Sequence, residues 1–406
     1  MQTTAPGPEG RTVAIDDGLL QPYRDELERR GSAPPRRLAY AAARIVLTDR
    51  YAELEPERAA DPGAIAEHLD WEATLAHRRR LAAHGFAVAE AMDTAQRFSL
   101  GWANAERLIR ATGELGLEHG FVAGAGADHL EGEHGRAELV DAVVHQARVI
   151  QAAGGEVILL PLPWLTRNAV DEGGFVEVYA AIVRQLEGPL YVHWLGAMFL
   201  PELRGYFPGA SFARVMALDP AKVRGAKLSL LDAELERRVR RELLERDQIV
   251  LTGDDRHFAE LIRGDGPLEV GRATRIGART VALGKFSHAL LGVFDAIAAP
   301  AGLALRFLAH GDAERYRALM APCEELGRWL FQDPTRHYRA GLAFLAWLNG
   351  WQSNRLLIGR EERARDNHHY LGAAELAARA GVLADAPRAA ERIRAVAAAC
   401  GGGERS

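Results

Sequence analysis

Eight short apolar runs of the kind that form buried strands alternate along this chain with longer segments whose apolar residues recur at helical spacing. The strand candidates are residues 38–47, 86–92, 119–126, 156–162, 189–195, 225–230, 248–253 and 288–294. The helix candidates are 71–84, 101–115, 137–153, 174–187, 211–217, 231–246 and 255–263, with another after the last strand. Continuous apolar runs, rather than alternating ones, are typical of parallel strands that are covered by helices.

Eight strand-plus-helix units predict a (β/α)8 barrel in the α/β class. A doubly wound open sheet is the alternative, but no GxGxxG turn follows the first run and the chain has no P-loop. We expect an irregular N-terminal leader over 1–36, with room for one short hairpin around residues 13–23, the barrel over 37–310 and a C-terminal helical extension over 311–406. Residues 265–286 resemble a hairpin in a helix-to-strand loop, which places them on the barrel face opposite an active site.

Composition favours a cytoplasmic protein without a nucleic-acid or membrane partner. The formal net charge is −5, and acidic and basic residues are interspersed. Cys323 and Cys400 lie far apart, which argues against a disulfide framework or a structural zinc site. We find no signal-peptide pattern and no apolar run long enough to span a membrane.

Lysine is rare in this chain, because only three of its 50 basic residues are lysines and the other 47 are arginines. Lys222 and Lys285 fall in predicted turn or hairpin segments and are expected to be solvated. Lys227 instead lies within the apolar run GAKLSL, where apolar walls would lower the pKa of its amine and free it for Schiff-base formation. The alternative is a lysine that reaches solvent or pairs with Asp254 or Asp255.

Other polar residues stand at the carboxyl ends of the predicted strands, where barrel enzymes carry their active sites. His193 ends the fifth run and could move protons near neutral pH, although a core histidine is the alternative. Asp254, after the seventh run, could hold substrate or cap the next helix. The residues expected to contact substrate are Asp93, Thr94, Trp164, Ser229, Gly253 and Asp254. The sequence lacks a histidine cluster of the kind that forms a metal site, and we expect no cofactor.

The order of these motifs resembles that of the dihydrodipicolinate synthase and N-acetylneuraminate lyase family of class I aldolases. HGFVAGAG is similar to its third strand, GAKLSLLDAE to its sixth and VLTGDDRHFAELI to its seventh, and the likeness covers about residues 37–350. The resemblance implies that Lys227 forms an imine with a keto group and that the protein is a homo-oligomer, a dimer or a tetramer.

The chain departs from the family pattern at three strand ends. His193 stands where the family commonly has a relay tyrosine, and Leu165 also replaces an expected tyrosine. MDTAQ replaces the family's Gly-Thr-Thr-Gly-Glu turn, which keeps Thr94 but adds the negative charge of Asp93. GAMF, after the fifth run, lacks the arginine that synthases use for a second substrate's carboxylate. A divergent branch, with a substrate other than that of dihydrodipicolinate synthase, is therefore expected.

The leading hypothesis is a lyase or aldolase that acts on a keto acid or sugar-derived carbonyl compound. Lys227 would be the imine nucleophile and His193 the general acid and base. A dehydratase that uses the same imine, or a barrel that binds a small ligand without catalysis, is the alternative. A metal-dependent barrel hydrolase or isomerase is a weaker option, because strand-end carboxylates are present without a histidine cluster.

Overall fold

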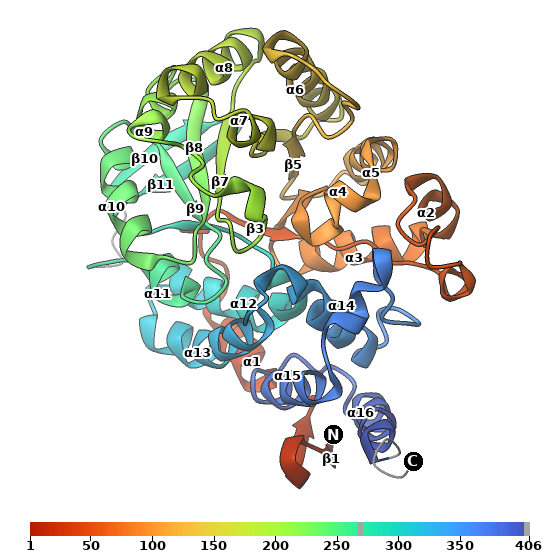
Figure 1. Ribbon diagram of the computed structural model, residues 1–406. Helices are drawn as coiled ribbons and strands as arrows, with labels where there is room; N and C mark the ends of the chain where they lie inside the picture. Colours follow the sequence, from red (N-terminus) through yellow and green to blue (C-terminus); the bar gives the residue numbers. More distant parts are fainter. Residues whose placement is uncertain (267–270, 402–406) are drawn as a thin grey trace. The chain divides into compact units, whose positions relative to one another are not determined.

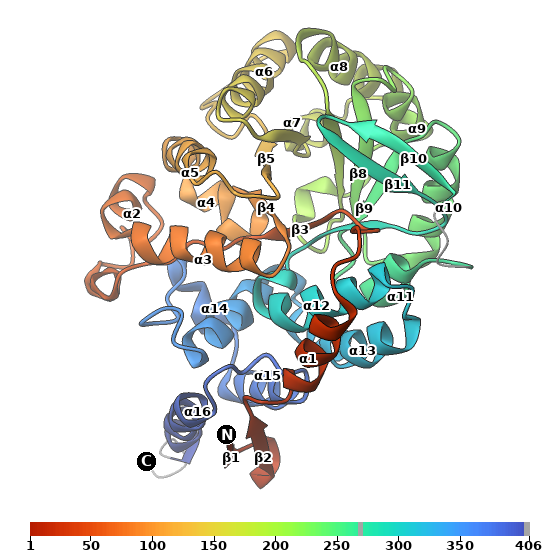
Figure 2. The ribbon, with the colours of Figure 1, turned by 180° about the vertical axis from the view of Figure 1, so that it is seen from behind.

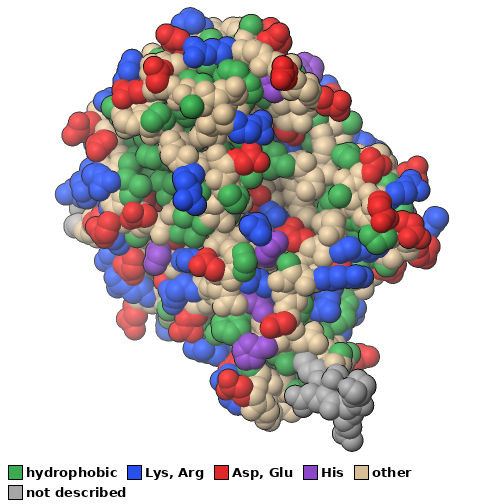
Figure 3. All heavy atoms as spheres, in the orientation of Figure 1, with side chains coloured by type: hydrophobic (Ala, Val, Ile, Leu, Met, Phe, Trp, Pro, Cys, Tyr) green, Lys and Arg blue, Asp and Glu red, His purple; other side chains and the backbone are tan. Residues whose placement is uncertain are grey.

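The computed structural model describes residues 1–266 and 271–401, and the chain divides into two compact units. The barrel unit contains Arg36–Ala43 and Gly85–Gly292 and holds a closed barrel of eight strands (Figure 1). The helical unit contains Met1–Pro35, Arg44–His84 and the chain from Val293 onward. On the face drawn in Figure 3, acidic and basic side chains are interspersed.

The barrel strands are parallel and follow one another in chain order around the barrel, which closes where β12 pairs with both β3 and β9. They are β3 (Ala39–Ala42), β4 (Ala87–Glu90), β5 (Phe121–Ala125), β6 (Glu156–Leu159), β7 (Leu190–Leu195), β8 (Val223–Ser229), β9 (Ile249–Thr252) and β12 (His288–Leu291). Each predicted apolar run contains or overlaps one of these strands, and the predicted (β/α)8 barrel is confirmed.

The first strand is shorter than its apolar run, which extends over 38–47. β3 ends at Ala42. The amide of Ala43 still donates to Ala89 O of β4 at 3.1 Å, but two later amides of the run bond to side chains. The amide of Arg44 donates to Asp295 Oδ2 at 3.0 Å and that of Val46 to Thr74 Oγ1 at 3.0 Å. Apolar composition alone therefore overestimates the length of the strand.

Helices make up most of the remaining structure. Those of the barrel unit are α4 (Arg97–Leu100), α5 (Trp102–Glu114), α6 (Arg136–Ala152), α7 (Pro163–Arg167), α8 (Glu172–Gln185), α9 (Ser211–Met216), α10 (Ala233–Leu244) and α11 (Phe258–Arg263). Those of the helical unit are α1 (Gln21–Arg30), α2 (Pro62–His68), α3 (Trp71–Ala83), α12 (Phe294–Ala309), α13 (Ala313–Leu330), α14 (Tyr338–Leu348), α15 (Asn367–Arg379) and α16 (Ala386–Gly401). Within the described ranges, none of these helices is both long enough and apolar enough to cross a membrane.

The N-terminal residues form a hairpin and a helix. Strands β1 (Gln2–Pro6) and β2 (Thr12–Asp16) form an antiparallel hairpin, and α1 follows it. Buried Val13, Ile15 and Leu27 give this segment apolar contacts that its content of proline and glycine does not reveal. The predicted division of the chain at residues 36 and 310 stays a prediction.

A hairpin closes the amino-terminal end of the barrel. It consists of β10 (Arg272–Ile276) and β11 (Arg279–Leu283), as predicted for this segment, of which residues 267–270 lie outside the described part of the chain (Figure 2). Ile276, Val281 and Leu283 join the same buried cluster as the interior side chains of the barrel. Arg279 donates to Glu156 Oε1 at 2.9 Å, at the start of β6. The hairpin thus seals the end of the barrel where β6 begins.

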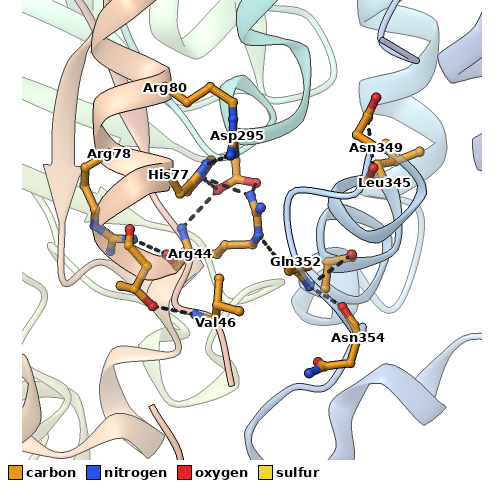
Figure 4. Close-up of polar contacts among 12 residues, drawn as sticks. Arg44, Val46, His77, Arg78, Arg80, Asp295, Leu345, Asn349, Gln352 and Asn354 are labelled. Carbon is orange, nitrogen blue, oxygen red and sulfur yellow. Dashed lines mark hydrogen bonds and ion pairs between the residues drawn. The ribbon is translucent and has the colours of Figure 1, made fainter. Parts of the chain in front are cut away.

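A buried charge cluster stabilises the helical unit (Figure 4). Asp295 forms an ion pair with Arg44 and accepts a hydrogen bond of 2.7 Å from His77 Nε2. Arg80 donates to the other ring nitrogen of His77 at 3.3 Å, and Gln352 accepts from Arg44 Nε at 2.9 Å. Burial lowers the pKa of His77 to about 3, with a further contribution from the charge of Arg44, so this imidazole is neutral. The cluster joins α3, α12 and the loop after α14 around one carboxylate.

Asp295→Asn should destabilise the protein by about 3–5 kcal/mol, because it leaves the charge of Arg44 buried without its carboxylate partner. Urea unfolding at neutral pH measures this loss. Glu177→Gln is the matched control, since it breaks an ion pair with Arg136 whose two side chains are 73% and 51% exposed, and it should cost about 1 kcal/mol or less. Equal losses in the two variants would contradict a structural role for the cluster.

Candidate active site

The side chain of Lys227 points into the barrel. Tyr191 of β7 belongs to the interior cluster and pairs in register with Gly225 of β8. Side chains two residues apart on a strand lie on the same face, so His193 and Lys227 also face inward. These two residues are themselves register partners across β7 and β8, near the carboxyl ends of both strands. The barrel therefore places the amine and the imidazole side by side in one layer of its interior.

The amine of Lys227 is shielded from solvent and lies in the field of two carboxylates. The residue is only 7% exposed. Burial lowers the pKa of Lys227 to about 8, against the opposing effect of the charges of Asp255 and Asp93. Near neutral pH the ammonium form still predominates, but the neutral amine, which is the form that attacks carbonyl carbon, is far more populated than in an ordinary solvated lysine.

His193 is buried beside the hydroxyl at the end of β8. Its Nε2 shares a hydrogen bond of 3.1 Å with Ser229 Oγ, and its Nδ1 has no hydrogen-bond partner among the described residues. Burial, followed by the nearby charge of Lys227, lowers the pKa of His193 well below its ordinary value. The imidazole is therefore neutral.

Gly253 allows three neighbouring groups to approach one another. A Cβ at this position would overlap Ser229 Oγ and would come within 2.9 Å of Leu228 O and 3.0 Å of Lys227 Cε. Ser229 and Lys227 therefore border the same small volume next to the Gly253 backbone. The sequence singled out this glycine as a substrate contact, and the structure gives it a steric reason to lack a side chain.

The two aspartates after β9 have different surroundings. Asp254 accepts hydrogen bonds from the amides of Arg256 and His257 at 3.0 and 3.1 Å, and its Oδ2 lies 2.9 Å from His257 Nδ1. These contacts are those of a carboxylate that stabilises a turn. Asp255 is the member of the pair whose charge acts on Lys227. The sequence left the partner of Lys227 open between them and placed Asp254 alone among the substrate contacts.

A polar network behind β9 holds the turn that carries Asp255. Glu236 of α10 accepts hydrogen bonds from Thr252 Oγ1 at 2.9 Å and from Ser287 Oγ at 2.6 Å. Thr252 Oγ1 in turn accepts the amide of Asp254 at 3.3 Å. Burial raises the pKa of Glu236 to about 7, although both hydroxyl donors oppose the shift. Sequence analysis missed Glu236, because it resembles any other charge on an amphipathic helix.

The turn after β4 carries Asp93 and Thr94 in a short 3-10 helix, Asp93–Ala95. Thr94 is 2% exposed. Arg97, two residues beyond this helix, forms a bidentate ion pair with Asp128 after β5, at 2.8 and 2.9 Å. Such a pair fixes the geometry of both loops. Sequence analysis missed Arg97, because its partner is distant along the chain.

Trp164 lies in α7, which follows β6. Its indole stacks on the ring of His134 at 6.2 Å between centroids and donates to the carbonyl of the same residue at 3.1 Å. These contacts connect the start of α7 with the loop after β5, and the role of Trp164 as a pocket wall stays a prediction. The structure brings Lys227, His193, Ser229, Gly253 and the charge of Asp93 together.

Metal-binding side chains do not gather in this site. Over residues 1–266 and 271–401, no group of three or more histidine, cysteine, aspartate or glutamate side chains is arranged to hold a metal ion. The described residues that act on Lys227 are carboxylates placed by separate strands. Their arrangement suits stabilisation of a positive charge on nitrogen.

A sequence-family model described as Protein of unknown function (DUF993) matches residues 16–401 of this chain. The chain belongs to this family. No curated protein matches the sequence. The family likeness extends over both compact units.

Several solved structures share the fold. A dihydrodipicolinate synthase from Thermotoga maritima is 16% identical, with a TM-score of 0.60 over 85% of this chain and 100% of that one. A chloride-inhibited dihydrodipicolinate synthase from Acinetobacter baumannii, complexed with pyruvate, is 13% identical, with a TM-score of 0.57 over 86% and 100%. KD(P)GA from T. tenax is 14% identical, with a TM-score of 0.55 over 84% and 98%. The predicted likeness to the dihydrodipicolinate synthase family is confirmed as a likeness of fold.

Asp255→Asn should lower the pKa of Lys227 below about 8 by roughly one unit or more, because it removes a negative charge that stabilises the ammonium form. Competitive labelling of lysines over a pH series, read by mass spectrometry, measures this shift. The exposed Lys285 serves as the internal reference. Asp254→Asn is the matched control and should leave the titration of Lys227 within about half a unit. An equal effect of both variants would contradict the assignment of Asp255.

Proposed function

We propose that this protein is a Schiff-base-forming lyase or aldolase that acts on a keto acid or sugar-derived carbonyl compound. The observation that carries the proposal is the inward-facing amine of Lys227, whose pKa burial lowers to about 8. The fold shared with dihydrodipicolinate synthases supports the reaction class. A pyruvate complex is known for one of these structural relatives, the Acinetobacter baumannii synthase.

The proposed reaction begins with attack of the neutral Lys227 amine on the carbonyl carbon of the substrate. The resulting carbinolamine loses water to give an imine, and protonation of the imine nitrogen makes it an electron sink for breaking or making the adjacent carbon–carbon bond. Asp255 and Asp93, which stabilise positive charge on Lys227, would stabilise the protonated imine in the same way.

His193 is the proposed general acid and base. A neutral imidazole can take a proton from the carbinolamine and return it to the leaving hydroxyl or to carbon. The hydrogen bond of 3.1 Å between His193 and Ser229 supports a route through the serine hydroxyl, which borders the same volume as the lysine side chain. This arrangement would replace the tyrosine relay that the family resemblance implies.

The substrate is proposed to carry little negative charge near Asp93. That carboxylate acts on Lys227 and would repel a substrate carboxylate placed beside it. A sugar-derived carbonyl compound, or a keto acid whose carboxylate lies elsewhere, fits this constraint. Asp93, Thr94, Trp164, Ser229, Gly253 and Asp254 remain the proposed substrate contacts. A dehydratase would use the same imine, and a barrel that only binds its ligand would form none.

We also propose that the protein works without a metal or organic cofactor, in the cytoplasm, as a homo-oligomer. A dimer or tetramer is expected from the family resemblance. These features remain predictions, as does the absence of a nucleic-acid partner.

Trapping with sodium borohydride tests the imine directly. Incubation with pyruvate or a 2-keto-3-deoxy sugar acid, followed by borohydride, should add the reduced substrate to the peptide that contains Lys227. Lys227→Arg should abolish the adduct while the protein remains folded, and Lys222→Arg should leave it unchanged. An adduct that has lost a second water, beyond the one released when the imine forms, without carbon–carbon cleavage, would favour the dehydratase. Failure of a wide carbonyl panel to label Lys227 would contradict the proposal.

A further inference from the structure

An open cavity of about 490 Å³ lies at the surface of the helical unit, and none of its lining residues belongs to the barrel unit that carries Lys227. One wall is apolar and includes Trp347 of α14, Leu356 and Val396 of α16. A cavity of this size, with a mostly apolar lining and a few polar groups, is typical of small-molecule sites.

Arg355 provides the positive charge of this cavity. Its guanidinium carbon lies 4.6 Å from the ring centroid of Tyr370 and within 6.0 Å of those of Phe344 and Trp347. Within the described part of the chain, Arg355 forms no ion pair, and its Nη1 is buried without a hydrogen-bond partner. The guanidinium also lines the cavity, where an incoming carboxylate can accept hydrogen bonds from its other two nitrogens, Nε and Nη2.

The loop that carries Arg355 is anchored beside the cavity by Asp49. Asp49 Oδ1 accepts hydrogen bonds from Ser353 Oγ and Asn354 Nδ2, both at 2.8 Å. The two donors, Asn354 first, lower the pKa of Asp49, so this residue stays ionised. Its charge on the cavity lining disfavours ligands with a second negative group. The lining thus combines one cation, one fixed anion and an apolar wall.

We propose that this cavity binds a small organic monocarboxylate with an apolar or aromatic body, whose carboxylate pairs with Arg355. The apolar body would lie against Trp347, Leu356 and Val396. Asp49 selects against dianions such as phosphate esters. The site is independent of the imine proposed for Lys227, because a ligand held in it needs no ketone.

Isothermal titration calorimetry on the full chain tests the site with benzoate and its neutral analogue benzamide. Benzoate should bind at least about tenfold more tightly than benzamide, because only benzoate can accept two charged hydrogen bonds from Arg355. Arg355→Gln should weaken benzoate to the level of benzamide and leave benzamide unchanged. Ala395→Trp, at an exposed position of α16 on the cavity lining, should abolish binding of both.

Arg363→Gln is the matched control, because this arginine also belongs to the helical unit and its side chain is 77% exposed. It should bind benzoate as the unaltered protein does. Thermal melting verifies that each variant is folded. Equal affinity for benzoate and benzamide, unchanged benzoate binding in Arg355→Gln, or no saturable benzoate binding at millimolar concentrations would each overturn the proposal.

Discussion

The chemistry proposed for this protein depends on the cost of placing one ammonium group inside a barrel of apolar strands. Water stabilises that charge strongly, and burial removes the water. Asp255 and Asp93 return only part of the lost stabilisation, because the pKa of Lys227 remains at about 8. If carboxylates fully offset the cost of burial, the lysine would stay charged and could not attack a carbonyl. Without any carboxylate nearby, nothing would stabilise the positive charge of a protonated imine. In the proposed mechanism, Asp255 and Asp93 hold the pKa of Lys227 between these two limits.

Residues outside the proposed reaction fix the positions of the carboxylates relative to the Lys227 amine. Gly253 lets the chain after β9 pass close to Lys227 and Ser229. Glu236 bonds Thr252, which holds the start of the turn that continues to Asp255. A displacement of about 1 Å in such a turn is enough to change the electrostatic interaction with a buried amine. The position of the carboxylate is thus set by α10 and β9 together.

The amino-acid sequence predicted the barrel and the central lysine because both leave local signals. Continuous apolar runs mark strands covered on both faces, and a lysine stands out in a chain that otherwise uses arginine. It did not separate Asp254 from Asp255, since adjacent residues in a turn point in different directions that only coordinates reveal. Arg97 was missed because its ion pair with Asp128 joins two loops that are separate along the chain. An ion pair between segments far apart in the sequence cannot be predicted from the residues that flank either partner.

The most direct measurement is a pH titration of Lys227 by NMR of protein labelled with carbon-13 at the lysine Cε positions. Only three lysines are present, and Lys227→Arg assigns the signal by its disappearance. The account predicts a midpoint near pH 8, lowered by burial against the opposing charges of Asp255 and Asp93. A midpoint near 10.4, the ordinary value for lysine, would show a solvated or fully paired ammonium and would contradict the central claim.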